Sequence, residues 1–243
     1  MSKIVITGHL GFIGSYLTKH LDATGLDIKE GNDILDCDLP NADTVIHLAA
    51  EAGVVASVAD PFTNARTNIL GTIRLLKRYA HAKFIFASTG GAIQETIESP
   101  YGLSKDTCER YVKMLHSNYV ILRFPNVYGL GSRSVADKFL NDPIEIFGDG
   151  SANRTYAHVD DVVRGIIQSL DWPQDTYKLG TDQNYTVLQI AEAIGKPVRF
   201  SPARHGELAH SSLPNRTPDW KDTIELMDYI KERLNVISSN SQP

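Results

Sequence analysis

The stretch IVITGHLGFIG, residues 4–14, decides the fold of this chain. It begins as an apolar strand and continues into a helix from about Phe12 to Leu21, with three glycines at the junction. In such a turn the first glycine permits the tight bend, the second lets a pyrophosphate approach the backbone, and the third allows close packing of helix on strand. Phosphates are also stabilised at a helix N-terminus. The stretch therefore predicts a dinucleotide-binding turn, with contacts from Gly8, Gly11, Phe12, Ile13 and Gly14.

Strands and helices alternate beyond this turn. Apolar strands are expected at 44–48, 83–87 and 119–123, and helices at 68–79 and 101–116. Unbroken apolar strands that alternate with helices are typical of a parallel sheet covered on both faces. The predicted fold class is therefore α/β, with a Rossmann-type doubly wound parallel sheet.

The residue pattern changes after Phe124, where turn-forming residues dominate and prolines recur. We therefore predict a dinucleotide-binding domain over residues 1–125, with a returning segment at about 156–170. Residues 126–155 and 171–243 are assigned to a small C-terminal substrate-binding lobe.

The composition limits the possible partners and compartment. With 24 basic and 29 acidic residues the formal charge is −5, so the chain lacks the broad basic face of a protein that binds nucleic acid or an anionic membrane. Two cysteines, Cys37 and Cys108, fit neither a disulfide framework nor a metal site, and we expect no metal. The N-terminus is already strand-like and no apolar run is long enough to span a membrane, so we expect a cytoplasmic protein.

An acidic residue after the second strand is expected to accept hydrogen bonds from the adenosine ribose. Asp27 lies 19 residues beyond Gly8 and fits best, although Glu30 is an alternative. A following strand at Asp33 and Ile34 is expected to touch the adenine. The absence of arginine between Gly14 and Asp33 favours NAD over NADP as the cofactor.

The strand ending in Leu48, Ala49 and Ala50 carries small side chains that let a dinucleotide lie against the backbone. Plain core packing is the alternative interpretation of these three residues.

Tyr101 and Lys105 stand four residues apart, on one face of a helix. A nearby ammonium lowers the pKa of a phenol from its usual value of about 10, which makes the phenol a usable base. Ser88 and Thr89, at the end of the preceding strand, offer hydroxyls that can bind a substrate oxygen. An ordinary surface pair is the alternative for Tyr101 and Lys105.

Taken in order, these segments resemble the extended short-chain dehydrogenases/reductases of the NAD-dependent epimerase/dehydratase family, and UDP-glucose 4-epimerases in particular. The similarity continues through RFPNVYG at 123–129, FGDG at 147–150, HVDD at 158–161 and PARHGE at 202–207. It thus covers nearly the whole chain.

The resemblance implies roles for individual residues. Tyr101 would be the catalytic base or acid, Lys105 its electrostatic partner and ribose contact, and Thr89 the hydroxyl that orients the substrate. Ser88 is a close alternative to Thr89 for this orienting role. Further contacts are implied for Asn68 with the cofactor, for Asn126 with the sugar nucleotide, and for Arg154 and Arg204 with its diphosphate. Helix packing is the alternative for Asn68, and solvated surface is the alternative for each arginine.

The resemblance implies NAD-dependent epimerisation of a nucleotide-diphosphate sugar, at C4 of a UDP-sugar, through a keto intermediate and return of hydride. The alternatives are a dehydratase or reductase of the same family, or a non-catalytic NAD-binding sensor. Gly90 and Gly91 stand where related dehydratases carry an acidic pair, which argues against dehydration.

A homodimer is also implied, through the helices at 68–79 and 101–116. Its apolar seam would include Ile73, Leu76, Tyr111 and Met114, or else these residues belong to the core. One departure from the family is the short connection of 11 residues between Thr89 and Tyr101.

Overall fold

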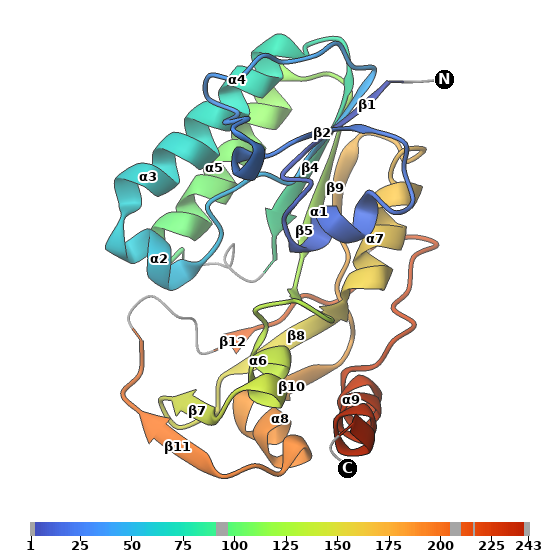
Figure 1. The fold of residues 1–243 in the computed structure, drawn as a ribbon. Helices are drawn as coiled ribbons and strands as arrows, with labels where there is room; N and C mark the ends of the chain where they lie inside the picture. The colour runs from blue at the N-terminus through green and yellow to red at the C-terminus, as the bar shows by residue number, and fades with distance from the viewer. Residues whose placement is uncertain (1–2, 91–96, 205–209, 216, 241–243) are drawn as a thin grey trace.

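The computed structural model describes residues 3–90, 97–204, 210–215 and 217–240 (Figure 1). Its upper half is built on a six-stranded sheet with the order β2-β1-β3-β4-β5-β9, in which every neighbouring pair is parallel. The strands are β1 (Ile4–Thr7), β2 (Thr24–Leu26), β3 (Thr44–His47), β4 (Lys83–Thr89), β5 (Tyr119–Phe124) and β9 (Asp175–Lys178).

Helices cover both faces of this sheet (Figure 1). Helices α1 (Phe12–Leu17) and α7 (Val159–Gln168) lie on one face, while α4 (Gly71–Arg78) and α5 (Pro100–Leu115) lie on the other. The chain reaches α4 through α2 (Val54–Ala59), α3 (Pro61–Ala65) and the π-helical turn η2 (Arg66–Leu70).

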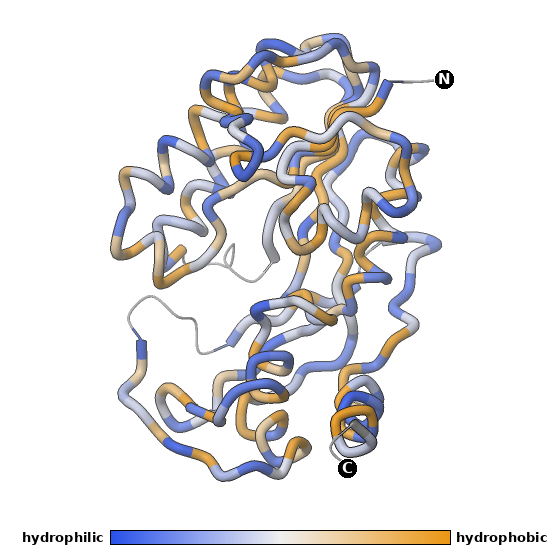
Figure 2. Tube along the Cα trace, viewed as in Figure 1, coloured by the Kyte–Doolittle hydropathy of each residue, from blue (hydrophilic) through white to orange (hydrophobic). Residues whose placement is uncertain are grey.

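Successive residues of each strand serve opposite faces, as the pleat requires. On β4, Phe84 and Phe86 pack beneath α4 and α5, whereas Ile85 joins the core beneath α1 and α7. Figure 2 shows the hydrophobic segments gathered in the strands at the centre of the upper half. The predicted α/β class with a doubly wound parallel sheet is confirmed.

The lower half is a smaller lobe with its own core. Strands β6 (Asn126–Tyr128), β10 (Asn184–Thr186) and β12 (His210–Ser211) all pair with β8 (Asn153–His158), while β7 (Ile144–Phe147) pairs with β11 (Val198–Ser201). Helices α6 (Val135–Asn141), α8 (Val187–Ile194) and α9 (Leu226–Asn240) pack around this core. None of the helices among the described residues is long and apolar enough to cross a membrane.

Two expectations about the strands are wrong. β9 belongs to the large sheet, although the sequence assigned 171–243 to the lobe. Its sequence DTYK carries no apolar run because it lies at the sheet edge. In addition, no strand forms at Asp33 and Ile34: between β2 and β3 there is only the 3-10 turn η1 (Ile28–Glu30), followed by irregular chain.

Candidate active site

The glycine loop between β1 and α1 has the geometry that its sequence predicts. Gly8 has a φ of +75°, and a Cβ there would lie 2.7 Å from the backbone N of Ala49. A Cβ on Gly14 would lie 2.3 Å from the carbonyl oxygen of Gly8. Both positions therefore require glycine, because any side chain would collide with backbone atoms.

A cavity of about 230 Å³ opens at the carboxyl ends of β1, β2 and β3, where dinucleotides bind in folds of this kind. The residues predicted to bind the cofactor that line it are Gly8, Gly11, Asp27, Asp33, Ile34, Leu48, Ala49 and Ala50. Phe12, Ile13 and Gly14 lie in the first turn of α1 and do not line this cavity. The structure thus brings together residues from three separate segments of the chain.

Asp27, rather than Glu30, faces this cavity. The Asp27 carboxylate accepts hydrogen bonds from the backbone N–H groups of Leu10 and Lys29, both at 3.0 Å, and the residue is 6% exposed. The Glu30 carboxylate instead lies 3.5 Å from the ring of His9. Since each carboxylate oxygen can accept more than one hydrogen bond, Asp27 is also able to accept ribose hydroxyls.

Lys29 is a residue of the ribose site that the sequence patterns did not indicate, because only the absence of arginine was used there. Its side chain lines the same cavity, and its ammonium donates a hydrogen bond of 2.8 Å to the Leu10 carbonyl. The signal was available, because Lys29 stands two residues after Asp27.

Asn68 holds the wall of this cavity from behind. Its side-chain amide accepts from the backbone N–H of Glu51 at 2.8 Å and donates to the Glu51 carbonyl at 3.1 Å. The same amide donates to the hydroxyl of Ser104, which in turn donates to the carbonyl of Tyr101. Asn68 therefore links the cofactor cavity to the helix that carries Tyr101, and it does not itself line the cavity.

A second buried chain of hydrogen bonds, also absent from the sequence analysis, runs through His47. The Thr72 hydroxyl donates to the Asn68 carbonyl at 2.6 Å, so it accepts from Nε2 of His47 at 2.9 Å. Nδ1 of His47 therefore accepts from the Thr7 hydroxyl at 2.7 Å. Burial, together with the charge of Lys105, lowers the pKa of His47 to about 3, which keeps the ring neutral.

Tyr101 and Thr89 meet at the carboxyl end of β4. The hydroxyl of Ser99 caps α5 by accepting from the N–H of Gly102 at 3.1 Å, which places Tyr101 in the first turn. The side chains of Tyr101 and Thr89 share a hydrogen bond. Burial raises the pKa of Tyr101 to about 12, and the hydrogen bond with Thr89 only partly opposes this.

Lys105 lies one turn further along α5 and is 5% exposed. Its ammonium donates to the Ala87 carbonyl at 2.8 Å and lies 4.8 Å from the centre of the Phe86 ring. Burial lowers the pKa of Lys105 to about 8, against the opposing effects of Cys108 and Glu109. The expectation that Lys105 draws the pKa of Tyr101 toward neutrality is therefore wrong for this structure, in which the desolvation of the phenol dominates.

Ser88 and Thr89, the two competing hydroxyls, have different partners. Ser88 donates to the carboxylate of Glu109 at 2.5 Å. That buried carboxylate also receives two hydrogen bonds from Arg123, at 2.8 and 2.7 Å. Ser88 is thus engaged in a packed ion-pair network, and Thr89 is the hydroxyl that reaches Tyr101.

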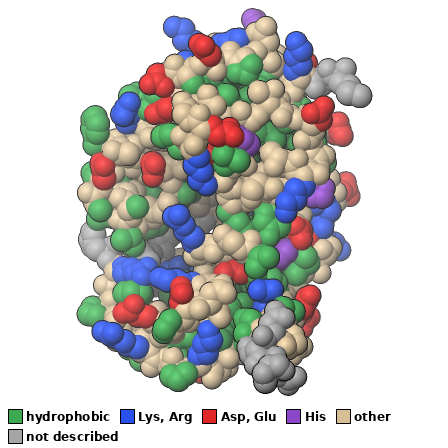
Figure 3. Space-filling model, viewed as in Figure 1, with side chains coloured by type: hydrophobic (Ala, Val, Ile, Leu, Met, Phe, Trp, Pro, Cys, Tyr) green, Lys and Arg blue, Asp and Glu red, His purple; other side chains and the backbone are tan. Residues whose placement is uncertain are grey.

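The residues expected to bind the substrate lie on the lobe. Asn126 donates to the Thr155 carbonyl at 3.1 Å. Arg154 is on β8, and the guanidinium carbon of Arg204 lies 3.4 Å from the centre of the Phe147 ring. Figure 3 shows lysine and arginine side chains gathered along the hollow between the two halves. Gly91, Gly206 and Glu207, which the sequence analysis also invoked, lie outside the described residues.

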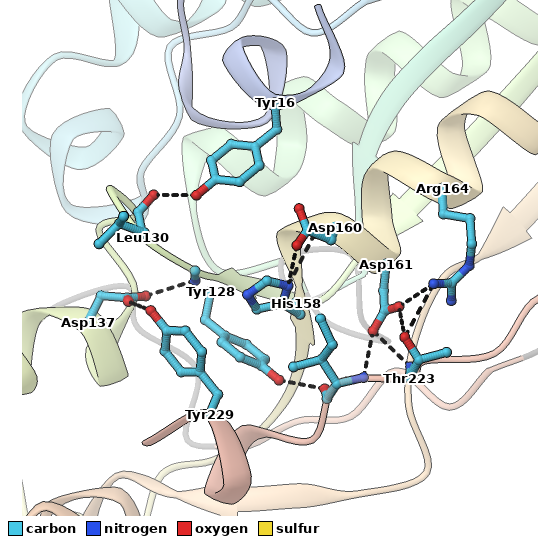
Figure 4. Close-up of polar contacts among 12 residues, drawn as sticks. Tyr16, Tyr128, Leu130, Asp137, His158, Asp160, Asp161, Arg164, Thr223 and Tyr229 are labelled. Carbon is cyan, nitrogen blue, oxygen red and sulfur yellow. Dashed lines mark hydrogen bonds and ion pairs between the residues drawn. The ribbon is translucent and has the colours of Figure 1, made fainter. Parts of the chain in front are cut away.

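Two buried carboxylates anchor the lobe (Figure 4). Asp161 on α7 accepts from the backbone N–H groups of Thr223 and Ile224, at 2.8 and 3.0 Å, and lies 2.6 Å from Arg164. Asp137 on α6 accepts from the N–H of Gly129 at 3.0 Å and from the Tyr229 hydroxyl at 2.5 Å.

A further hydrogen bond joins the lobe to the glycine-loop helix. The hydroxyl of Tyr16, on α1, donates to the Leu130 carbonyl at 2.8 Å (Figure 4). The loop after β6 is therefore held between α1 and the core of the lobe.

Comparisons with known proteins agree with this arrangement. Residues 4–180 match the model of the NAD dependent epimerase/dehydratase family. A UDP-glucuronate 4-epimerase from Thermodesulfobacterium geofontis is 34% identical over 234 residues, covering 81% of this chain and 72% of the relative. A UDP-glucose 4-epimerase from Mycolicibacterium smegmatis is 28% identical over 313 residues, covering 99% of this chain and 100% of the relative.

Solved structures show the same similarity over almost the whole chain. The UDP-glucose 4-epimerase of Thermotoga maritima with UDP-glucose is 27% identical, with a TM-score of 0.85 over 99% of this chain and 100% of that chain. The Thermus thermophilus UDP-glucose 4-epimerase in complex with NAD is 26% identical, with a TM-score of 0.82 over 96% of this chain and 98% of that chain. The family predicted from the motifs is confirmed, and the chain belongs to the NAD-dependent epimerase/dehydratase family.

Proposed function

We propose that this chain is an NAD-dependent epimerase that inverts C4 of a UDP-sugar. The observation that carries the proposal is the hydrogen bond between Tyr101 and Thr89, at the same sheet edge as the cavity lined by Gly8 and Asp27. The relatives and solved structures described above, several of which are named as UDP-sugar 4-epimerases, support it.

Tyr101 would take the proton from the C4 hydroxyl of the sugar, and Thr89 would orient that hydroxyl. NAD, held by the residues that line the cavity at Gly8 and Asp27, would supply a reversible acceptor for the C4 hydride, so that hydride can return to the other face of the sugar. Tyr101 then returns its proton to the C4 oxygen. Turnover would therefore consume no cofactor.

The charge of Lys105 has a specific task in this scheme. Because burial raises the pKa of Tyr101 to about 12, the phenol holds its proton at neutral pH in this structure. Tyr101 can therefore accept the C4 proton only after it has lost its own proton to solvent, and a protonated ammonium one turn away stabilises the phenolate that this leaves. The hydrogen bond from Lys105 to the Ala87 carbonyl keeps the ammonium on this side of β4.

The dehydratase alternative is disfavoured by packing at Gly90. A Cβ at that position would lie 2.3 Å from Cδ2 of Leu213, so an acidic residue directly after Thr89 would have to displace the Leu213 side chain. A reductase would instead consume its cofactor stoichiometrically, and a non-catalytic NAD-binding sensor would bind NAD without altering any sugar.

The first test incubates the purified protein, without added NAD, with UDP-glucose, UDP-galactose, their N-acetyl forms and UDP-glucuronate. We expect one of these to yield its 4-epimer without net NADH, detected by chromatography and mass spectrometry. A product lighter by one water would identify a dehydratase. NAD-bound protein that alters none of the sugars would favour the sensor.

A cytoplasmic homodimer is part of the proposal. Met114 is 73% exposed on α5, as a residue of a dimer seam would be, whereas Leu76 is 1% exposed and belongs to the core. Both cysteines are free thiols, which fits a reducing compartment. Sedimentation of wild-type protein and of Met114→Glu tests the dimer, and a monomeric wild type would remove it.

A further inference from the structure

One strand of the dinucleotide-binding sheet is missing from this chain. Folds of this class place a further strand beyond the second one, in the order 3-2-1-4-5-6. Here β2 is the edge, and residues 27–43, all of them described, form one 3-10 turn and irregular chain. The alignment with the Mycolicibacterium relative runs over 313 residues, more than this chain possesses, so the relative carries insertions that this chain lacks.

The missing strand matters because the irregular segment forms a wall of the cofactor cavity. Asp33 and Ile34 line the cavity on the side of Asp27, which is the side of the adenosine. Without a neighbouring strand, the carbonyl groups of this segment have no sheet partners. Backbone groups in that position must be bonded in another way or the wall will move.

Arg74 supplies those bonds from α4. Its guanidinium donates to the carbonyls of Ile34 and Cys37, each at 2.7 Å. The fork of a guanidinium suits this task, because it presents several donors in a fixed plane and remains charged. Arg78, one turn later, donates to the Leu39 carbonyl at 3.1 Å and to the side chain of Asn41 at 2.7 Å.

Ile34 is also held by packing against the same helix. It is 4% exposed, and its Cδ1 lies only 2.6 Å from where a Cβ on Gly71 would be. The Ile34 side chain therefore fills the space that the glycine leaves on α4. Arg74 thus holds the wall by its backbone carbonyls, and the packing of the Ile34 side chain against Gly71 holds it a second time.

We propose that Arg74 is a positioning residue for the adenosine half of NAD, and that it replaces the missing strand by bonding the cavity wall to α4. The inference rests on the cofactor site proposed above. Arg74 acts through Ile34 and does not line the cavity. Loss of Arg74 should therefore weaken the binding of every ligand that carries an adenosine, and leave the binding of other ligands unchanged.

The test is calorimetric titration of cofactor-depleted wild type, Arg74→Ala, Arg74→Lys and Lys77→Ala with NAD, ADP-ribose and a UDP-sugar. We expect Arg74→Ala to raise the Kd of NAD and of ADP-ribose by about tenfold, the effect of losing a charge-assisted hydrogen bond. Arg74→Lys should recover part of this, since it keeps the charge and loses the fork. Lys77, on the same helix between the two arginines, is the matched control and should leave each Kd unchanged.

Gly71→Ala provides a second route to the same wall if Arg74→Ala proves unstable. The added methyl group should displace Ile34 and so weaken the binding of NAD and ADP-ribose, although Arg74 is intact. Unchanged NAD affinity in folded Arg74→Lys and Gly71→Ala overturns the inference, as does an equal loss of UDP-sugar affinity. If the variants show the expected changes in Kd but the wild type epimerises no sugar, the proposed function is refuted and the role of Arg74 stands.

Discussion

Each half of the molecule is stabilised by a different kind of contact. The upper half is a ladder of parallel strands between two apolar layers, in which Thr7, His47 and Ser88 are among the few buried polar residues of the strands. The lobe has an apolar core as well, but the segments around it are joined by the buried carboxylates of Asp137 and Asp161 (Figure 4). Periodic hydrophobicity thus specifies the strands of the first half, whereas individual long-range polar contacts position the segments of the lobe and the cavity wall beside α4.

The largest expected effect tests chemistry in the upper half. Tyr101→Phe removes the proton carrier and should lower kcat by about 10³-fold, within the range of general acid–base catalysis. The ring remains, so the fold and NAD binding should persist. Tyr111→Phe, on the same helix and partly buried, is the matched control. A Tyr101→Phe variant with near-normal kcat in the sugar assay would contradict the proposed mechanism.

The next effect tests whether a carboxylate on α7 of the upper half holds the segment that leads into α9 of the lobe. Asp161→Ala should lower the free energy of unfolding by about 3 kcal/mol, because it leaves two backbone N–H groups and Arg164 without their acceptor. Its neighbour Asp160 is exposed, and Asp160→Ala should cost well under 1 kcal/mol. Urea denaturation of the two variants gives the comparison, and equal losses would show that Asp161 has no special role.

Lys105 allows a pH test of burial in the upper half. The folded-state pKa of about 8 lies below the value of about 10.4 for an unfolded lysine. The unfolded chain therefore binds the extra proton, and stability rises as pH increases between these two values. We expect a gain of about 2 kcal/mol between pH 7.5 and 9.5.

The comparison with Lys105→Met isolates this effect from other titrating groups. Denaturant unfolding of cofactor-free protein at each pH measures it. The free energy of unfolding of the wild type should rise relative to that of Lys105→Met as pH increases. Curves that stay parallel across this range would mean that the ammonium is not desolvated.

The sequence predicted the upper half well because its signals are local. The glycine loop, the strands β1, β3, β4 and β5, and the Tyr101 helix were each visible as a short pattern. β9 was missed because an edge strand needs no apolar run, and the pattern before β3 contained no sign that a strand was missing. Helix α9 was overlooked although Leu226, Ile230, Leu234 and Ile237 have helical spacing.

The polar contacts had no such local signal. Asp161 bonds to residues 62 and 63 positions away, and Arg74 to carbonyls 40 and 37 positions away. A carbonyl that accepts from a distant arginine has no signature in its own side chain. Such contacts become visible only when the fold brings the two segments together.

The smallest effect separates the neighbouring hydroxyls of Ser88 and Thr89. Thr89→Val keeps the shape and removes the partner of Tyr101, so kcat should fall about tenfold, equivalent to one hydrogen bond. Ser88→Ala should cost about 1 kcal/mol of stability and leave kcat nearly unchanged, because Arg123 continues to neutralise Glu109. Kinetics and denaturation measured on both variants distinguish the two roles. Two adjacent residues of a strand point to opposite faces, so Ser88 and Thr89 cannot exchange partners. A larger loss of kcat in Ser88→Ala than in Thr89→Val would therefore reverse the assignment of the catalytic hydroxyl.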